Sequence, residues 1–172
     1  NYSKDNTRAE IAMACAKNKK VKAIFNVTNF GQFNSPFYAL CQATGDCAIC
    51  MCCDFQDPVE LIPRFVHEWE NGHKIVSGIK TSSKENPFIY FLRSVYYKMI
   101  KSMSTTEMIE QFTGFGLYDK SFLALLRKLD DPIPFIRGIV AEYGHGFNRI
   151  EVPYEQPRRR AGKTHNNFYS LY

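Results

Sequence analysis

Apolar and polar positions alternate along the chain in blocks whose lengths suit short strands and amphipathic helices. The longest apolar block, residues 47–53, is continuous and is bounded by Asp46 and Asp54. A continuous run of this length is typical of a strand covered on both faces, as in a parallel sheet. The pattern therefore predicts a buried strand that ends at Asp54.

Other blocks predict further elements of both kinds. The expected helices are 7–16, 35–43, 88–101, 121–129 and 134–143. The expected strands or extended segments are 21–27, 74–79, 112–117 and 147–152. Strands that alternate with helices indicate an α/β layered fold with a mainly parallel sheet.

One more helix has a clear start signal in the sequence. Asp57 is a suitable N-cap, Pro58 suits the first helical position, and Glu60 completes an Asp-x-x-Glu capping box. Asn71-Gly72 is a typical helix end. The spacing predicts a helix between these two signals.

Composition narrows the class of protein. The chain has 172 residues, of which 45% are hydrophobic and 23% charged, and these values exclude disordered, collagen-like and coiled-coil chains. No apolar run approaches the roughly 18–20 residues needed to cross a bilayer, and no signal or transit peptide opens the chain. Because the chain opens on Asn1 rather than methionine, we expect a piece of a longer protein, soluble as these residues stand.

Positive charge is concentrated at the two ends of the chain. Residues 1–22 hold six basic and two acidic side chains, and residues 158–172 hold four basic and no acidic ones. The net charge of the whole chain is +5, so the middle is mildly acidic. Basic ends favour an anionic ligand or surface without identifying it.

The six cysteines do not form a disulfide framework in the sequence. Four of them fall within residues 47–53, whereas disulfide frameworks space cysteines across loops. Cys47 and Cys50 have the short spacing of half a zinc site, but no second pair follows. We interpret the cysteines as buried free thiols of a protein from a reducing compartment.

Candidate chemistry lies directly after the predicted strand 47–53. In a parallel sheet, ligands bind beyond the carboxyl ends of the strands, which is where Asp54 and Gln56 fall. Both offer oxygen donors of the kind that Mg²⁺ or Mn²⁺ prefers, and a divalent ion there could bridge a nucleotide diphosphate.

These residues also carry a resemblance to a known family. Asp54-Phe-Gln-Asp-Pro-Val-Glu60 resembles the Asp-x-Asp-Leu-Gln-Asp-Pro-Pro-Glu motif of glycosyltransferase family 2, in the branch of polyprenyl-phosphate and dolichyl-phosphate sugar transferases. Further segments resemble the family in the same order along the chain. They are Asn1–Thr7, Asn29–Gln32, Gly45-Asp46, Ile62-Pro63, Trp69–Gly72, Val76–Lys80, Phe112–Asp119 and Arg159–Thr164.

The resemblance implies a GT-A-like α/β/α sandwich with a mainly parallel, Rossmann-like sheet that lacks its first strand. Residues 1–172 would be a partial catalytic domain, with 155–172 as a basic loop and the start of a C-terminal segment. The implied activity (EC 2.4 class) moves a sugar from a nucleotide-diphosphate donor, UDP-linked rather than another nucleotide, to a polyprenyl phosphate of the undecaprenyl or dolichyl type. It implies Mg²⁺ or Mn²⁺ as cofactor and a location on the cytoplasmic side of a membrane. Without the missing strand, we expect the fragment itself to be inactive.

The resemblance also implies roles for individual residues. Asp54 and Gln56 would hold the metal, with Asp54 counted as catalytic, and Asp57 with Pro58 would fix the turn. The diphosphate would be contacted by basic and hydroxyl side chains, namely Lys80, Arg159, Lys163 and Thr164.

Two positions depart from the family pattern. Cys52 stands where the family has the first Asp of its Asp-x-Asp pair, which puts the strength of metal binding in question. Gly114 stands where the dolichyl-phosphate branch often has a suspected base. A phosphate acceptor is already anionic and needs no base, whereas a hydroxyl acceptor does. The absence of a carboxylate at Gly114 therefore favours a phosphate acceptor. Otherwise the base would be Glu107, Glu110 or Asp119.

Other functions stay open from the sequence alone. A family 2 enzyme could instead act on a saccharide hydroxyl in cell-surface polysaccharide assembly. A basic nucleic-acid-binding module is a remote alternative, because the tail lacks aromatic residues interleaved with its basic ones, and we expect no nucleic-acid partner. A zinc protein built on the cysteine run is the least favoured of these alternatives.

Overall fold

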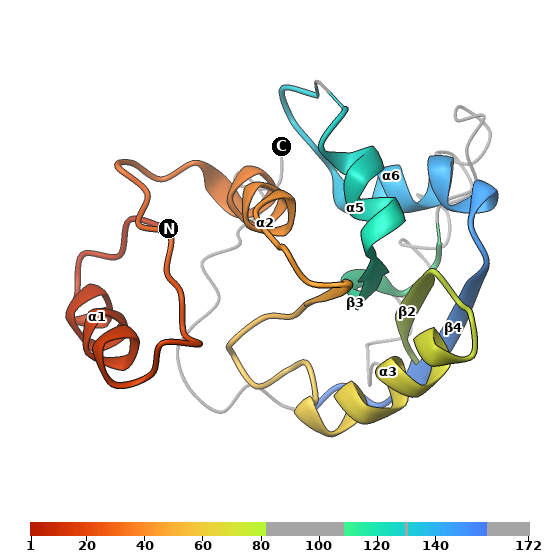
Figure 1. Ribbon diagram of the computed structural model, residues 1–172, viewed down its shortest axis with the longest axis horizontal. Coiled ribbons are helices and arrows are strands. Elements are labelled where there is room, and N and C mark those ends of the chain that lie inside the picture. Colours follow the sequence, from red (N-terminus) through yellow and green to blue (C-terminus); the bar gives the residue numbers. More distant parts are fainter. Residues whose placement is uncertain (82–108, 130, 158–172) are drawn as a thin grey trace, which may run out of the picture.

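The computed structural model describes residues 1–81, 109–129 and 131–157. Within these ranges the protein is an α/β fold built on a four-stranded sheet with the order β1-β3-β2-β4 (Figure 1). The strands are β1 (Cys47–Cys50), β2 (Ile75–Lys80), β3 (Phe112–Asp119) and β4 (Arg149–Tyr154). The α/β class expected from the alternating pattern is confirmed.

The directions of the strands correct one expectation. β3 runs antiparallel to both of its neighbours, β1 and β2, and only the β2–β4 pair is parallel. The sheet is therefore mixed rather than mainly parallel in its pairing, although β1, β2 and β4 all run in one direction. A continuous apolar run indicates a strand covered on both faces, and a sheet between two layers of helices can hold strands of either direction.

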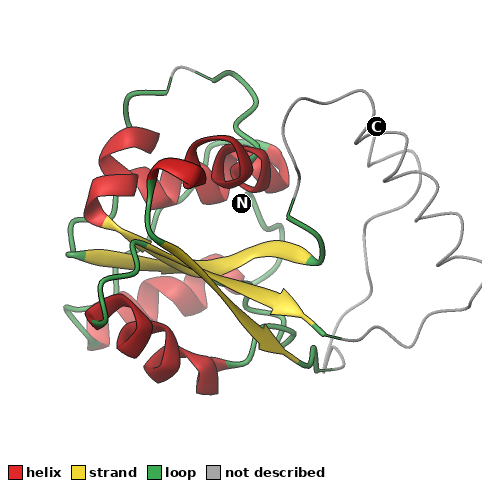
Figure 2. Ribbon diagram, turned by 90° about the vertical axis from the view of Figure 1, so that its right-hand side faces the viewer, coloured by secondary structure: helices red, strands yellow, loops and turns green. Residues whose placement is uncertain are grey.

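Helices cover both faces of this sheet, as Figure 2 shows. On one face, helices α2 (Gly31–Cys41), α5 (Lys120–Leu126) and α6 (Ile136–Tyr143) pack over a buried cluster that includes Ile75, Tyr118 and Phe122. On the other face, a short 3-10 turn (Val59–Leu61) leads into α3 (Ile62–Glu70), whose Phe65 packs on Phe115. A second 3-10 turn, Gly144–Gly146, connects α6 to β4. Among the described residues the expected α/β/α sandwich is confirmed.

The first thirty residues pack less closely than the rest. Helix α1 (Thr7–Lys17) forms as predicted but buries none of its side chains. The strand expected at 21–27 is absent, and these residues have no strand pairing. Strand pairing needs a neighbour to accept its backbone hydrogen bonds, and the described structure places none beside this segment.

The region after β1 also differs from the prediction. β1 ends at Cys50 rather than Cys53, so Cys52 and Cys53 are exposed instead of buried. The predicted capping box is wrong, because α3 begins at Ile62 and its first residues have no side-chain cap from Asp57. Asp57 has a different partner, described below. All six cysteines are free thiols, as expected, and the other four are partly buried.

The predicted helix 88–101 lies outside the described residues. Of the helices that are described, none combines the length and the hydropathy that crossing a membrane requires.

Candidate functional site

The last residues of β1, β2 and β4 and the first residues of β3 meet at one edge of the sheet. This edge holds most of those candidate residues from the sequence that the structure describes. The antiparallel direction of β3 brings its start to the edge where β1, β2 and β4 end. Asp54 and Gln56 follow β1, Lys80 ends β2, and Glu110 lies just before β3. The structure therefore brings these four residues to the same edge.

The segment Cys52–Asp57 forms a tight turn, which we name the metal loop after the cation that the sequence predicts for it. The backbone N–H of Cys52 donates a 2.7 Å hydrogen bond to Asp57 Oδ2, which closes the loop at its base. At its tip, Asp54 Oδ1 accepts a 3.1 Å hydrogen bond from the N–H of Gln56. Between them Phe55 has a φ of +62°, a conformation that is uncommon for an aromatic residue and that places a strained backbone at the centre of the turn.

The donor set of the metal loop fits a hard divalent cation that is shared with a substrate. Asp54 and Gln56 supply oxygen atoms from one turn, and Mg²⁺ commonly takes one or two carboxylates together with substrate phosphates and water. Over the described ranges, no group of three or more His, Cys, Asp or Glu side chains is arranged to hold a metal ion by itself. The loop therefore suits a metal site completed by a diphosphate rather than a closed structural one.

Cys52 does not replace the missing carboxylate electrostatically. Desolvation of the thiol by the surrounding turn, together with the Asp57 and Asp54 carboxylates, raises the pKa of Cys52 to about 11. The thiol is therefore neutral at pH 7, whereas an aspartate at this position would carry a charge. A cation in this loop would therefore meet one negative charge fewer than in relatives with aspartate here, which is the physical reason to expect weaker metal binding.

Asp57 and Tyr154 form the polar centre behind the loop. Asp57 is buried and its Oδ1 lies 3.4 Å from the Tyr154 hydroxyl at the end of β4. Burial raises the pKa of Asp57, while the N–H of Cys52 and the positive charge of Lys80 oppose that rise. Burial, reinforced by the Asp57 carboxylate, also raises the pKa of Tyr154 to about 12.

A cavity of about 310 Å³ opens beside the metal loop and extends to the N-terminus of α6. Its charged lining residues are Asp57 and Arg137, and its apolar lining includes Phe33, Phe135 and Ile136. The guanidinium of Arg137 lies 4.6 Å from the centre of the Phe135 ring, a cation–π distance. Phe135 in turn meets the Phe33 ring edge to face at 5.3 Å.

Arg137 is a candidate binding residue that the sequence analysis missed. It occupies the second position of α6, where the helix dipole favours acidic side chains and disfavours basic ones. The N-cap residue Phe135 makes no side-chain cap, so the first N–H groups of α6 have no capping partner there. A basic residue near the start of a predicted helix was the signal that could have identified it.

Gly114 at the cavity wall has a backbone that favours glycine. Its φ is +96°, and a Cβ built there would lie 3.3 Å from Cγ2 of Ile136. An aspartate at this position would be strained on both counts. Among the described residues that line the cavity, Asp57 is the single one with a carboxylate. This carboxylate already accepts a hydrogen bond from the N–H of Cys52.

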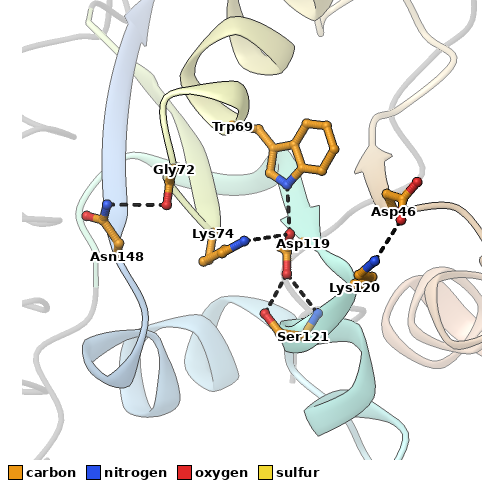
Figure 3. Close-up of polar contacts among 8 residues, drawn as sticks. All are labelled: Asp46, Trp69, Gly72, Lys74, Asp119, Lys120, Ser121 and Asn148. Carbon is orange, nitrogen blue, oxygen red and sulfur yellow. Dashed lines mark hydrogen bonds and ion pairs between the residues drawn. The ribbon is translucent and has the colours of Figure 1, made fainter.

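Asp119, a candidate base from the sequence, lies at the opposite edge of the sheet. It pairs with Cys47 at the start of β1, whereas Asp54 follows the end of β1. Figure 3 shows its carboxylate surrounded by donors: Oδ2 accepts from Trp69 Nε1 at 2.7 Å and from Lys74 Nζ at 3.2 Å. Its Oδ1 accepts from the backbone N–H and the hydroxyl of Ser121, so Asp119 is the N-cap of α5.

These contacts correct the expectation for Asp119. Burial opposes its ionisation, but the hydrogen bonds from Ser121, Trp69 and Lys74 outweigh that effect and hold the pKa of Asp119 well below its usual range. A carboxylate with so low a pKa is a poor proton acceptor. Its role is structural, as a link between α3, β2 and α5.

The remaining candidates divide into two groups. Glu110 is exposed at the edge that carries Asp54, beside Gln111, whose φ is +57°. Glu107, Arg159, Lys163 and Thr164 lie outside the described residues.

Comparison with known proteins identifies relatives over nearly the whole chain. The family model described as Glycosyl transferase family 2 matches residues 1–132. An uncharacterized glycosyltransferase, YkoT of Bacillus subtilis, is 32% identical over 94% of this chain and 48% of its own length. The bactoprenol glucosyl transferase of Shigella phage SfX is 27% identical over 99% of this chain and 55% of its own length. A prophage bactoprenol glucosyl transferase homolog of Escherichia coli is 26% identical over the same shares. The chain thus spans about half the length of the curated relatives it matches.

Proposed function

Because this chain belongs to glycosyltransferase family 2, we propose that it contributes the donor and acceptor sites of an enzyme that transfers a sugar from a nucleoside-diphosphate donor to a polyprenyl phosphate. The family and the bactoprenol glucosyl transferases among its relatives support the reaction class. The choice of a lipid phosphate as acceptor rests on the composition of the cavity beside the metal loop.

The donor side of the proposal rests on the metal loop. Asp54 and Gln56 would hold Mg²⁺ or Mn²⁺, and the cation, when bound, would neutralise charge that develops on the departing diphosphate. Lys80 lies at the same edge and offers a positive charge to a phosphate oxygen. Arg159, Lys163 and Thr164 remain proposed phosphate contacts, supported by the resemblance of their segment. The same resemblance is the support for a UDP-linked sugar.

The acceptor side rests on one observation, the presence of Arg137 beside the aromatic part of the cavity lining, Phe33 and Phe135. The guanidinium and the uncapped N-terminus of α6 both favour an anion, and phosphate is the anion whose oxygens match a guanidinium fork. The rings of Phe33 and Phe135 offer apolar surface for the first part of a hydrocarbon chain. A saccharide would find few polar partners among these residues.

The proposed step needs no general base. A phosphate oxygen of the acceptor forms the new bond to the anomeric carbon while the bond from that carbon to the nucleoside diphosphate breaks. The attacking oxygen is already anionic, so no proton has to be removed. This agrees with a cavity whose one described carboxylate, Asp57, is buried and engaged. A hydroxyl acceptor would instead require a base, for which Glu110 is the exposed candidate at this edge.

A lipid acceptor also implies that the intact protein works at a membrane. We propose the cytoplasmic side, where nucleotide sugars are made. The basic segment 158–172 supports this placement, because clustered arginines attract anionic lipid.

The proposal is tested by substituting Asp54→Ala in the intact protein. We expect loss of Mn²⁺-dependent binding of a UDP-sugar in calorimetry, while Asp131→Ala, an exposed carboxylate of the turn that precedes α6, keeps it. Unchanged donor binding in Asp54→Ala would overturn the donor site. Transfer to a saccharide hydroxyl but not to undecaprenyl phosphate would overturn the acceptor.

A further inference from the structure

Tyr154 ends β4, an outer strand of the sheet, at the edge that carries the proposed site. It is not one of the residues that the donor or acceptor would touch. We propose that Tyr154 is a positioning residue: its hydroxyl holds Asp57, and Asp57 holds the metal loop in the shape that presents Asp54 and Gln56. This inference rests on the proposed function, since it assigns the support of the same donor site.

The first step of the argument is the closed base of the loop. Asp57 Oδ2 accepts the 2.7 Å hydrogen bond from Cys52 N–H, which joins the two ends of the six-residue turn. The tip then depends on the strained Phe55 and on the bond from Gln56 N–H to Asp54 Oδ1. A turn that contains a residue with φ of +62° persists only where its surroundings fix it. The Asp57 carboxylate therefore helps to fix the geometry of the loop.

The second step is what fixes that carboxylate. The Tyr154 hydroxyl donates to Asp57 Oδ1 at 3.4 Å, so the two carboxylate oxygens have different partners on different elements. Asp57 is 6% exposed and Tyr154 is also 6% exposed, so water has little access to replace either contact. Groups that orient metal ligands from behind in this way commonly change metal affinity when removed.

The third step is what fixes Tyr154 itself. Its carbonyl oxygen accepts from the backbone N–H of Thr81 at 2.9 Å and from the Thr81 hydroxyl at 3.1 Å. It is the register partner of Lys80 in the parallel β2–β4 pair. The side chain of Thr113, at the start of β3, hydrogen-bonds to the Tyr154 hydroxyl. The Tyr154 ring meets the Phe115 ring edge to face at 5.4 Å. Tyr154 is thus held by β2 and β3 and transmits that rigidity to the loop after β1.

The decisive variant is Tyr154→Phe, which keeps the ring contacts and removes the hydroxyl. We expect Mn²⁺ affinity in the presence of UDP to fall about 10-fold, the lower end of the effect of groups that orient metal ligands. The probe is Mn²⁺ with UDP, measured by electron paramagnetic resonance on the intact protein. This signal does not depend on turnover. The altered coordination of the remaining bound Mn²⁺ should also broaden its spectrum.

Tyr118→Phe is the matched control. Tyr118 is a fully buried tyrosine of the same sheet whose hydroxyl donates to the carbonyl of Gly114 at 2.9 Å rather than to Asp57. Tyr154→Phe loses the bonds of the hydroxyl with Asp57 and Thr113, and Tyr118→Phe loses its bond to Gly114. We therefore expect a fall in thermal stability in both variants, but weaker Mn²⁺ binding in Tyr154→Phe alone.

The outcomes separate the inference from the proposed function. Equal Mn²⁺ affinity in Tyr154→Phe and the unsubstituted protein would overturn the positioning role, provided that Asp54→Ala abolishes binding. If Asp54→Ala binds Mn²⁺ normally, the donor site itself is misplaced and both proposals fall. An equal loss of Mn²⁺ affinity in Tyr118→Phe would show that Tyr154 affects metal binding only through the stability of the fold. That result would also overturn the inference.

Discussion

Trp69 and Asp119 join helix α3 to the sheet through one short hydrogen bond. The indole N–H on α3 donates to the carboxylate at the end of β3 at 2.7 Å, and the same carboxylate caps α5 on the opposite face of the sheet. A buried acid with donors from three elements is expected to stabilise the fold rather than to perform chemistry.

Replacement of Asp119 by Asn should destabilise the protein by about 2 kcal/mol at pH 7, since an amide loses the charge-assisted bonds and turns an N–H₂ group toward other donors. The folded-state pKa of Asp119 lies below its unfolded value, so its contribution is complete above about pH 4 and is lost as the pH falls through the lowered folded-state pKa. The gap between the two proteins in urea unfolding, followed by circular dichroism, should therefore be wide at pH 7 and narrower at pH 3.

The control for this prediction is Asp46→Asn. Asp46 forms a 2.8 Å ion pair with Lys120, but both side chains are largely exposed, and exposed pairs contribute little to stability. Similar losses in Asp46→Asn and Asp119→Asn would contradict the special role of the buried carboxylate.

Replacement of Gly116 by Ala should destabilise the sheet by about 1–3 kcal/mol, the range for forcing extra volume into a packed interior. A Cβ at this position would lie 2.5 Å from the carbonyl oxygen of Val76 on the neighbouring strand. At Gly146 a Cβ would meet nothing within 4 Å, so Gly146→Ala should leave the melting temperature unchanged or slightly raised. Equal melting temperatures for the two variants would show that the sheet can relax around the added methyl group.

Replacement of Arg137 by Gln should raise the KM for undecaprenyl phosphate at least 10-fold and leave the KM for the donor within about twofold, because a fork of two hydrogen bonds to phosphate is lost on the acceptor side alone. Arg64→Gln, an exposed position on α3, controls for the loss of one positive charge. A rise in the KM for the donor alone would contradict this assignment and would indicate that Arg137 binds the donor.

Amide hydrogen exchange on the 172-residue chain should divide it into two parts. We expect residues 1–30 to exchange fastest among the described segments, because α1 buries no side chain and 21–27 makes no strand pairing. Amides of β2 and β3, whose side chains are mostly buried, should exchange slowest. Strong protection of α1 in this chain would mean that it packs more firmly than its exposure indicates.

The sequence predicted elements whose pattern depends on local chemistry. Helix α1, helix α5 and strand β3 appear close to their expected positions, since spacing of apolar residues determines which faces can be buried. The edge that carries Asp54, Gln56 and Lys80 also followed from the rule that ligands bind beyond strand ends.

Properties that depend on distant partners could not be predicted in the same way. The reversed direction of β3 places Glu110 at the same edge of the sheet as Asp54 and Asp119 at the opposite edge, and no local signal encodes that direction. Asp57 had the sequence context of a helix cap, yet the N–H of Cys52 is the donor that it binds. Arg137 reached the cavity only because α6 packs beside the start of β3.

Trp69 is the single tryptophan of the chain and is fixed against Asp119 at the edge opposite the metal loop. Its fluorescence is therefore an intrinsic reporter of one event only. Emission should shift when α3 separates from the sheet on unfolding, and should stay constant when metal or nucleotide binds at the far edge. The protein thus carries a built-in optical signal that separates loss of structure from occupation of the site, without any added label.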